Sequence, residues 1–489
     1  MRWLLVSLML FAGLSATARN KQTYNPRDYG LFEAKSGLER FEALMRCHTD
    51  AIRNNGRISY EGIEKIELEI PFKSQSIPLP EETNFASVKI YAYNHDRNYV
   101  LFLMTNEVKE VDVDGESIDD GNFKANPMLV RGTKLLIVED QNLWVKERIG
   151  YKFNGYKRKD ILVVKNGRAI NNTVQPYNNA NSAPNGWYCD VNKGKKVIKN
   201  LDFYRTENST VKTYPIAVRY QYNVELSNIS ITTPQNTEIV DDCGIMIYDC
   251  AKVVLNDARI NGTYSKENKS GSGVRLINVY DVSINRMYAK CEWGVFGNYC
   301  VNRAVLRDCD INRFDIHCYG KDIKSINCKY SQLYNQFSSV YGDIEFKDCK
   351  FVNFVPILIE SSYNAYSPFE LKFKNCTFHL NMEINYLITL FGVPEPINPR
   401  EELREKCIPN ITIRNCSVLL DDDVNEWFLV KTHGLKYKGK MDYLSLIDIQ
   451  GLTVNGSDNA KLKIFSEKVP FKKELKIKTK KINTLFKEY

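Results

Sequence analysis

The sequence predicts an all-β solenoid, in which short strands wind into stacked coils. Three observations carry this prediction. A strand-like hexapeptide recurs along the chain, its copies are mostly 19 to 29 residues apart, and long helical periodicity is absent from residues 85 to 465. Units of this length with several short strands and no helix are typical of β-solenoids. The leucine-rich repeat is the alternative, but its helix-bearing unit is not seen in this sequence.

The hexapeptide reads apolar, polar, apolar, basic, Asp or Asn, and then Cys. Its clearest copies span residues 304–309, 344–349, 371–376 and 411–416. The alternation has the period of a strand. An Asp or Asn at the strand end tolerates the left-handed backbone that a tight corner needs. Because stacked strands lie ~4.8 Å apart, we predict that the Cys side chains form a buried ladder and not a redox centre.

The N-terminus resembles a secretory signal, with Arg2, an apolar run from Leu4 to Leu14 and small residues before a cleavage site at Ala18. The run is too short to span a membrane, which needs about 20 residues. We therefore expect a secreted or periplasmic chain without a transmembrane segment. The predicted parts are a signal peptide (1–18), an N-terminal capping segment (19–84), a parallel β-helix (85–465) and a basic tail or closing strand (466–489).

The charge and cysteine content exclude several classes of partner and site. The net charge is +8, and much of it lies in a lysine-rich tail. Basic patches interleaved with aromatic residues, which a nucleic-acid groove needs, are not seen elsewhere. The 13 cysteines form no CxxC pair, so we predict no zinc site. We expect the partner to be a polysaccharide, with acidic polysaccharides among the candidates. We expect the chain to be a monomer.

The coil pattern resembles the pectin-lyase-like superfamily of right-handed parallel β-helices. Asp28-Tyr29-Gly30 followed by a helical stretch (38–54) is similar to the N-terminal segment of those proteins. The resemblance implies a right-handed parallel β-helix solenoid with a short N-terminal capping helix over the first coil. It indicates the fold and not the function, because this fold hosts lyases, hydrolases, epimerases and non-catalytic adhesins.

The tract from Arg313 to Asp322 is the densest candidate for chemistry. If Ile316 points inward, Asp315, His317 and Tyr319 point outward together. Asp315 would then orient or charge the imidazole of His317, which suits a catalytic residue. A surface histidine on a strand is the structural alternative.

Further candidates lie on neighbouring coils. Glu292 is a candidate acid, and Trp293 and Phe296 are candidates for stacking on sugar rings. Arg275 lies between two inward residues and resembles the basic catalytic residue of pectate-lyase-like enzymes. Tyr341 and Glu360 continue the outward column as substrate-binding residues.

Asp242, in the pair Asp241-Asp242, resembles the acid–base pair of polygalacturonases. The other motifs of that family, among them Gly-His-Gly, are missing from the sequence. A polar turn is therefore the alternative role for the pair. Calcium is left open as a cofactor, since the nearby aspartates have no fixed ligand spacing.

These residues favour an exported β-helix protein that binds and cleaves a polysaccharide. Hydrolysis would use carboxylates such as Asp242 and Glu292. β-Elimination would use His317 or Arg275 as the base. The alternatives are a non-catalytic polysaccharide-binding or cell-surface solenoid, and a tailspike-like viral fibre. The signal-like N-terminus argues against the fibre.

Overall fold

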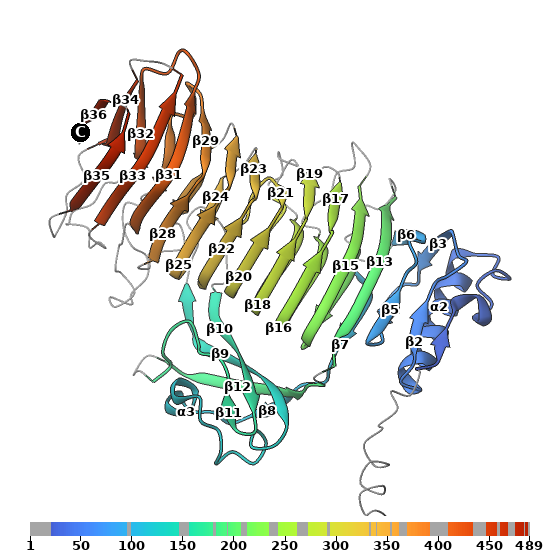
Figure 1. Cartoon of the computed structure of the whole chain (residues 1–489). Helices are drawn as coiled ribbons and strands as arrows, with labels where there is room; N and C mark the ends of the chain where they lie inside the picture. The colour runs from blue at the N-terminus through green and yellow to red at the C-terminus, as the bar shows by residue number, and fades with distance from the viewer. Residues whose placement is uncertain are drawn as a thin grey trace, which may run out of the picture.

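The chain forms a long right-handed parallel β-helix with a smaller β-structure on one side (Figure 1). This computed structural model describes residues 21–487, except for 95–98, 146–155, 179–181, 193, 207–212, 234–242, 262–271, 291–293, 332–333, 339, 353–354, 361–368, 392–408, 434–445, 457–459, 468–474 and 484. The predicted signal peptide therefore lies outside the described residues. The predicted all-β fold with stacked parallel strands is confirmed.

Two parallel sheets run along the β-helix. The larger has 25 strands: β1 (Thr23–Tyr24), β2 (Arg57–Ser59), β3 (Lys65–Ile70), β4 (Ile77–Pro78), β5 (Glu82–Asn84), β6 (Lys89–Asn94), β7 (Tyr99–Thr105), β13 (Lys196–Arg205), β14 (Thr213–Arg219), β15 (Tyr222–Thr232), β16 (Cys243–Asn256), β17 (Arg259–Asn261), β18 (Ser272–Asn285), β19 (Tyr288–Lys290), β20 (Tyr299–Arg307), β21 (Asp310–Ile311), β22 (Gly320–Ile326), β23 (Lys329–Ser331), β25 (Val340–Lys347), β26 (Lys350–Val352), β28 (Phe369–Lys374), β29 (Thr377–Leu380), β31 (Asn410–Leu420), β33 (Leu446–Asn455) and β35 (Lys476–Ile482). The smaller has six: β24 (Asn335–Phe337), β27 (Ile357–Glu360), β30 (Tyr386–Phe391), β32 (Glu426–His433), β34 (Lys461–Phe465) and β36 (Leu485–Lys487).

A helix covers the N-terminal end of the solenoid, as predicted. A 3₁₀ turn, η1 (Pro26–Tyr29), leads to α2 (Gly37–Arg53), which begins with a capping box between Ser36 and Glu39. Its buried face includes His48, which donates from Nδ1 to the carbonyl of Pro78 (2.8 Å). Burial lowers the pKa of His48 to about 4, so this histidine is a neutral part of the core.

The hexapeptide repeat forms the predicted corner and ladder. Asp308, Asn327, Asp348, Asn375 and Asn415 all have positive φ, between 51° and 55°. The cysteines that follow them are free and at most 2% exposed: Cys309, Cys328, Cys349, Cys376 and Cys416. Amide side chains bridge the coils at the corner, for example Asn375 Nδ2 to Asp348 Oδ1 (2.9 Å). The left-handed corner turns the chain after each strand and directs the next side chain into the core.

An insert between β7 and β13, residues 108–191, was not predicted from the sequence. It contains β8 (Lys109–Val111), α3 (Gly115–Asp120), β9 (Thr133–Val145), β10 (Tyr156–Lys165), β11 (Arg168–Ala169) and β12 (Pro184–Asp190). Its strands form a separate five-stranded antiparallel sheet, which lies beside the β-helix in Figure 1. The prediction of an uninterrupted β-helix over 85–465 is therefore wrong here. Strands of both kinds alternate with period two, so periodicity alone does not separate them.

The two ends of the β-helix also differ in detail from the predicted parts. Strands β2 and β5 lie within the predicted capping segment and already belong to the large sheet. In the tail, β35 pairs in parallel with β33, and β36 pairs with β34. The tail therefore contains strands of a last coil. Neither helix of the described chain has the length and apolar character of a membrane span.

Candidate active site at Asp315 and His317

Asp315 and His317 form an oriented pair at the surface of the β-helix. Nε2 of His317 lies 2.8 Å from Asp315 Oδ2, and Arg313 Nη2 lies 2.9 Å from the same oxygen. The Asp315 side chain is fully buried, whereas that of His317 is 22% exposed. A carboxylate that accepts from Nε2 leaves Nδ1 as the proton-accepting nitrogen of the neutral imidazole. The arrangement therefore suits a general base.

The backbone around the pair is held by buried amide side chains and by an isolated parallel bridge between Ile316 and Phe337. Asn298, which is fully buried, donates from Nδ2 to the carbonyl of Asp315 (2.9 Å). The carbonyl of Asn298 accepts from the backbone N–H of His317 (2.9 Å). Asn335 Oδ1 accepts from the N–H of Phe314 (2.8 Å). Ile316 lies in the core, and the side chains of Asp315 and His317 meet on the other side of the segment, as the alternation predicted. The Asp315 side chain is nevertheless fully buried there, paired with Arg313, and not exposed as expected.

Arg275 lies on the outward side of β18, as its alternation predicted. Its register partner on β16 is Met246, and Tyr248 lies two residues further along the same strand. Arg275 is half-buried, between the buried Val274 and Leu276. The side chain of Asn298 also accepts from the N–H of Leu276 (3.1 Å), so it links the Arg275 strand to the Asp315–His317 pair.

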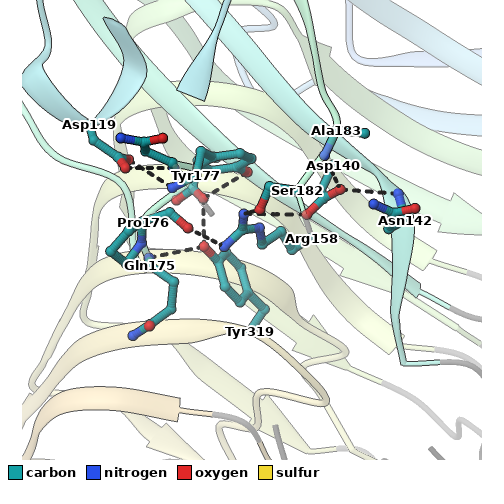
Figure 2. A network of polar contacts seen from close by, with 12 residues as sticks. Asp119, Asp140, Asn142, Arg158, Gln175, Pro176, Tyr177, Ser182, Ala183 and Tyr319 are labelled. Atoms are coloured by element: carbon teal, nitrogen blue, oxygen red, sulfur yellow. Dashed lines mark hydrogen bonds and ion pairs between the residues drawn. The ribbon is translucent and has the colours of Figure 1, made fainter. Parts of the chain in front are cut away.

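The predicted outward orientation of Tyr319 is wrong. Its backbone is left-handed (φ 56°), so it occupies a corner where strand alternation stops. The side chain is fully buried and extends into the insert, where its hydroxyl donates to Asp160 Oδ2 (2.7 Å) and accepts from the N–H of Gln175 (3.1 Å). Figure 2 shows Tyr319 pointing from the β-helix towards Gln175 and Tyr177. In this structure Tyr319 attaches the insert and does not face a substrate.

The polar network around Tyr319 was not found from the sequence. Asp160, fully buried on β10, also accepts from the hydroxyl of Tyr177 (3.1 Å). Burial raises the pKa of Asp160 to about 6, against the hydrogen bond from Tyr319 and the charge of Arg158. Arg158 is ion-paired with Asp140 (3.3 Å) and lies over the Tyr177 ring (Figure 2). The charged residues just before the apolar residues 161–164 were the only hint of this network in the sequence. The sequence could not show the partner of Asp160, because Tyr319 lies 159 residues further along the chain.

Two other predicted substrate-binding residues have different surroundings from those expected. Phe296 is fully buried in the core and packs edge-on against Phe314 (5.0 Å between ring centres), so it offers no face to a sugar. Tyr341 is half-buried and packs edge-on against Tyr319 (6.4 Å) beside Val174 of the insert. Its contact is therefore with the insert and not with a column of groove residues.

Some candidates cannot be placed. Glu292, Trp293 and Asp242 lie outside the described residues, and their predicted roles stay predictions. Glu360 ends β27, but its side chain is outside the described part as well.

A second charged cluster, also missed, lies where β10 meets the corners of the β-helix. Asp249 is buried and accepts from Asn278 Nδ2 (2.8 Å). Burial raises the pKa of Asp249, against the Asn278 bond and the charge of Lys159. Lys159 is ion-paired with Glu139 (2.5 Å). Burial opposes ionisation of Glu139, but the bonds from Lys159 and Lys157 still lower its pKa.

Cavities and metal-binding groups add little to the site. A cavity of about 650 Å³ lies in the insert and is lined by residues between positions 110 and 128, among them Asp112, Asp114 and Met128. No predicted site residue lines it. Within the described part of the chain, no three His, Cys, Asp or Glu side chains are grouped to hold a metal ion. Calcium therefore stays a prediction.

Comparison with known proteins gives the fold. No protein-family profile matches the sequence, and no curated protein matches it either. The structure is similar to the tailspike protein gp49 of Pseudomonas phage LKA1, with a TM-score of 0.54 and 13% identity over 94% of this chain and 81% of that chain. It is also similar to the Gp54 tailspike of Acinetobacter baumannii bacteriophage AP22, with a TM-score of 0.56 and 11% identity over 94% and 75%. This likeness gives the fold alone: like these two tailspikes, the chain is a right-handed parallel β-helix.

Proposed function

We propose that this chain is an exported protein that binds an acidic polysaccharide and cleaves it by β-elimination, with His317 as the base. The observation that carries the proposal is the buried Asp315 carboxylate, which orients a partly exposed imidazole (2.8 Å) and is itself held by Arg313. A histidine that a carboxylate holds in one orientation is a common general base in enzymes.

The reaction would proceed at a uronate ring. Nδ1 of His317 takes the proton from C5, the electron pair forms a double bond between C4 and C5, and the C4–O bond to the neighbouring sugar breaks. The leaving oxygen takes up a proton. Arg275, on the outward side of β18, would supply the positive charge that attracts the uronate carboxylate.

Elimination fits the described residues better than hydrolysis. Hydrolysis needs two accessible carboxyl groups on opposite sides of the bond. Asp315 is fully buried and paired with Arg313, so it does not fill such a role. The saccharide class is supported by the tailspike of phage AP22, a protein of the same fold that was solved with a capsular saccharide.

A non-catalytic polysaccharide-binding protein is the second candidate. It is favoured by the Arg313–Asp315 ion pair, which is almost wholly buried and would stabilise this irregular segment without any reaction.

The test is a panel of acidic and neutral polysaccharides incubated with the purified chain, its His317→Gln variant and a matched control, His379→Gln. His379 also pairs with an aspartate, Asp421 (3.0 Å), but both side chains are exposed. New reducing ends together with ultraviolet absorbance of an unsaturated product are expected. His317→Gln should lower turnover by about 100-fold or more, and His379→Gln should leave it unchanged.

Other outcomes separate the alternatives. Reducing ends without the unsaturated product would mean hydrolysis. Binding without any cleavage across the panel would mean the non-catalytic protein. Equal activity of the wild type and His317→Gln would remove His317 from the mechanism.

A further inference from the structure

The basic position of the hexapeptide repeat has no part in the proposed active site. The structure stacks this position in one outward column, in which Arg307, Ile326, Lys347, Lys374, Arg414, Gln450 and Lys480 are successive register partners on β20, β22, β25, β28, β31, β33 and β35. Its five cations, Arg307, Lys347, Lys374, Arg414 and Lys480, are here called the basic row. All five side chains are exposed or half-buried.

Charge repulsion within the basic row is unfavourable for the fold. Lys347 lies directly opposite Lys374, and Lys374 directly opposite Arg414. Like charges opposite each other on neighbouring strands are destabilising. The column contains no carboxylate. Such a column is therefore not explained by stability.

The adjacent outward column of the same strands shows the opposite pattern. There Lys324 pairs in register with Glu345 (2.7 Å between Nζ and Oε2), and Glu345 is followed by Lys372. Lys372 in turn is paired with Asp343 (2.8 Å). In this column, positive and negative side chains alternate, and Lys324 and Lys372 each pair with a carboxylate. In the basic row, by contrast, all the charged residues are positive.

Only part of the basic row is neutralised by neighbours. Arg414 is paired with Asp448 (2.5 Å), and Lys347 lies 3.8 Å from Asp348. Arg307, Lys374 and Lys480 have no ion pair with any residue that the structure describes. Within the described part of the chain, three cations are therefore left to pair with an external anion.

We propose that the basic row binds an acidic polysaccharide that lies along the axis of the β-helix. Successive cations are one or two strand spacings apart. From its first to its last cation the row spans six strand spacings, about 29 Å. A linear polymer with one carboxylate on each ring matches this arrangement, because a sugar ring is about as long as the ~4.8 Å spacing of strands. The row stands apart from Asp315–His317, from which the corner at Tyr319 and the length of β22 separate it.

A nucleic acid fits the surface less well. Binding of single strands uses aromatic side chains on which bases stack. The outward column beside the basic row, from Lys324 through Glu345, Lys372 and Thr412 to Asp448 and Lys478, contains no aromatic residue.

The test compares two variants of equal charge. Arg307→Gln/Lys374→Gln/Lys480→Gln removes the three unneutralised cations, and Lys324→Gln/Lys329→Gln/Lys372→Gln removes three lysines that are each ion-paired with a carboxylate. Binding to polygalacturonate, to neutral dextran and to a single-stranded DNA is measured by calorimetry or biolayer interferometry at low and high salt.

Polygalacturonate should bind the wild type in a salt-dependent manner, and dextran should not. The basic-row variant should bind about tenfold more weakly, and the control variant within about threefold of the wild type. The basic-row variant should also unfold no more easily than the wild type, since repulsion is relieved. Equal weakening in both variants, tighter binding of DNA than of polygalacturonate, or no binding would overturn the proposal. Because the readout is binding, loss of cleavage in His317→Gln does not affect it.

Discussion

The hydroxyl of Tyr319 donates a 2.7 Å hydrogen bond to Asp160, although 159 residues separate the two in the chain. Tyr319 belongs to a corner of the β-helix and Asp160 to β10 of the insert. The bond therefore joins the two parts of the molecule next to the proposed site, because Tyr319 is two residues from His317.

Replacing Tyr319 by Phe should weaken the attachment of the insert. The variant leaves the buried Asp160 carboxylate and the N–H of Gln175 without this partner, which costs about 1–3 kcal/mol of unfolding free energy. Urea unfolding and limited proteolysis of residues 108–191 measure the effect. Tyr204→Phe is the control, since its hydroxyl bonds to Asp202 in a partly exposed position. Equal stability of the two variants would contradict the role of Tyr319.

Asp160 should make stability fall as the pH rises. Its pKa is raised by burial from an ordinary 3.8 to about 6, so between these values the folded chain binds more protons than the unfolded chain. The stabilisation is complete below pH 3.8 and lost through pH 6, by about 2–3 kcal/mol in all. Asp160→Asn should abolish this slope. Unfolding free energies of the two proteins at a series of pH values give the difference, and parallel curves would rule the assignment out.

At the left-handed corner, variants with Gly and with Ala at position 375 should differ in unfolding stability. Asn375 has φ 54° and bonds to Asp348 (2.9 Å). Asn375→Ala keeps a Cβ in the left-handed region but loses this bond and the polar side chain by which Asn tolerates that conformation, which costs about 1–2 kcal/mol in total. Asn375→Gly loses the bond but avoids the strain, and should be the more stable variant. A Gly variant less stable than the Ala variant, by thermal or urea unfolding, would show that the corner is not strained.

The cysteine ladder should be inert in the folded protein. Cys309, Cys328, Cys349, Cys376 and Cys416 are free and at most 2% exposed. Elsewhere in the core, burial raises the pKa of the Cys189 and Cys300 thiols to about 12, which also suppresses the reactive thiolate. A thiol reagent should label these cysteines only as the chain unfolds in urea. Mass spectrometry locates the labels, and rapid labelling of the ladder without denaturant would contradict the burial.

The sequence determined the repeating part of the protein. Alternation, an Asx corner and a small apolar residue in each copy are local properties, and each acts through backbone geometry within six residues. Hence the coils, the positive φ of Asn375 and Asn415, and the buried cysteines were all predictable. The capping helix was predictable for the same reason, since Ser36 and Glu39 are close in the chain.

Only the tertiary structure decided how the site is built. Alternation predicted exposed side chains for Asp315 and Tyr319. Asp315 does share a side with His317 but is fully buried and paired with Arg313, whereas the corner turns Tyr319 towards Asp160. The insert was hidden because its strands have the same period as those of the β-helix. These features depend on contacts between residues far apart in the chain, and no local pattern encodes which distant partner satisfies a buried polar group.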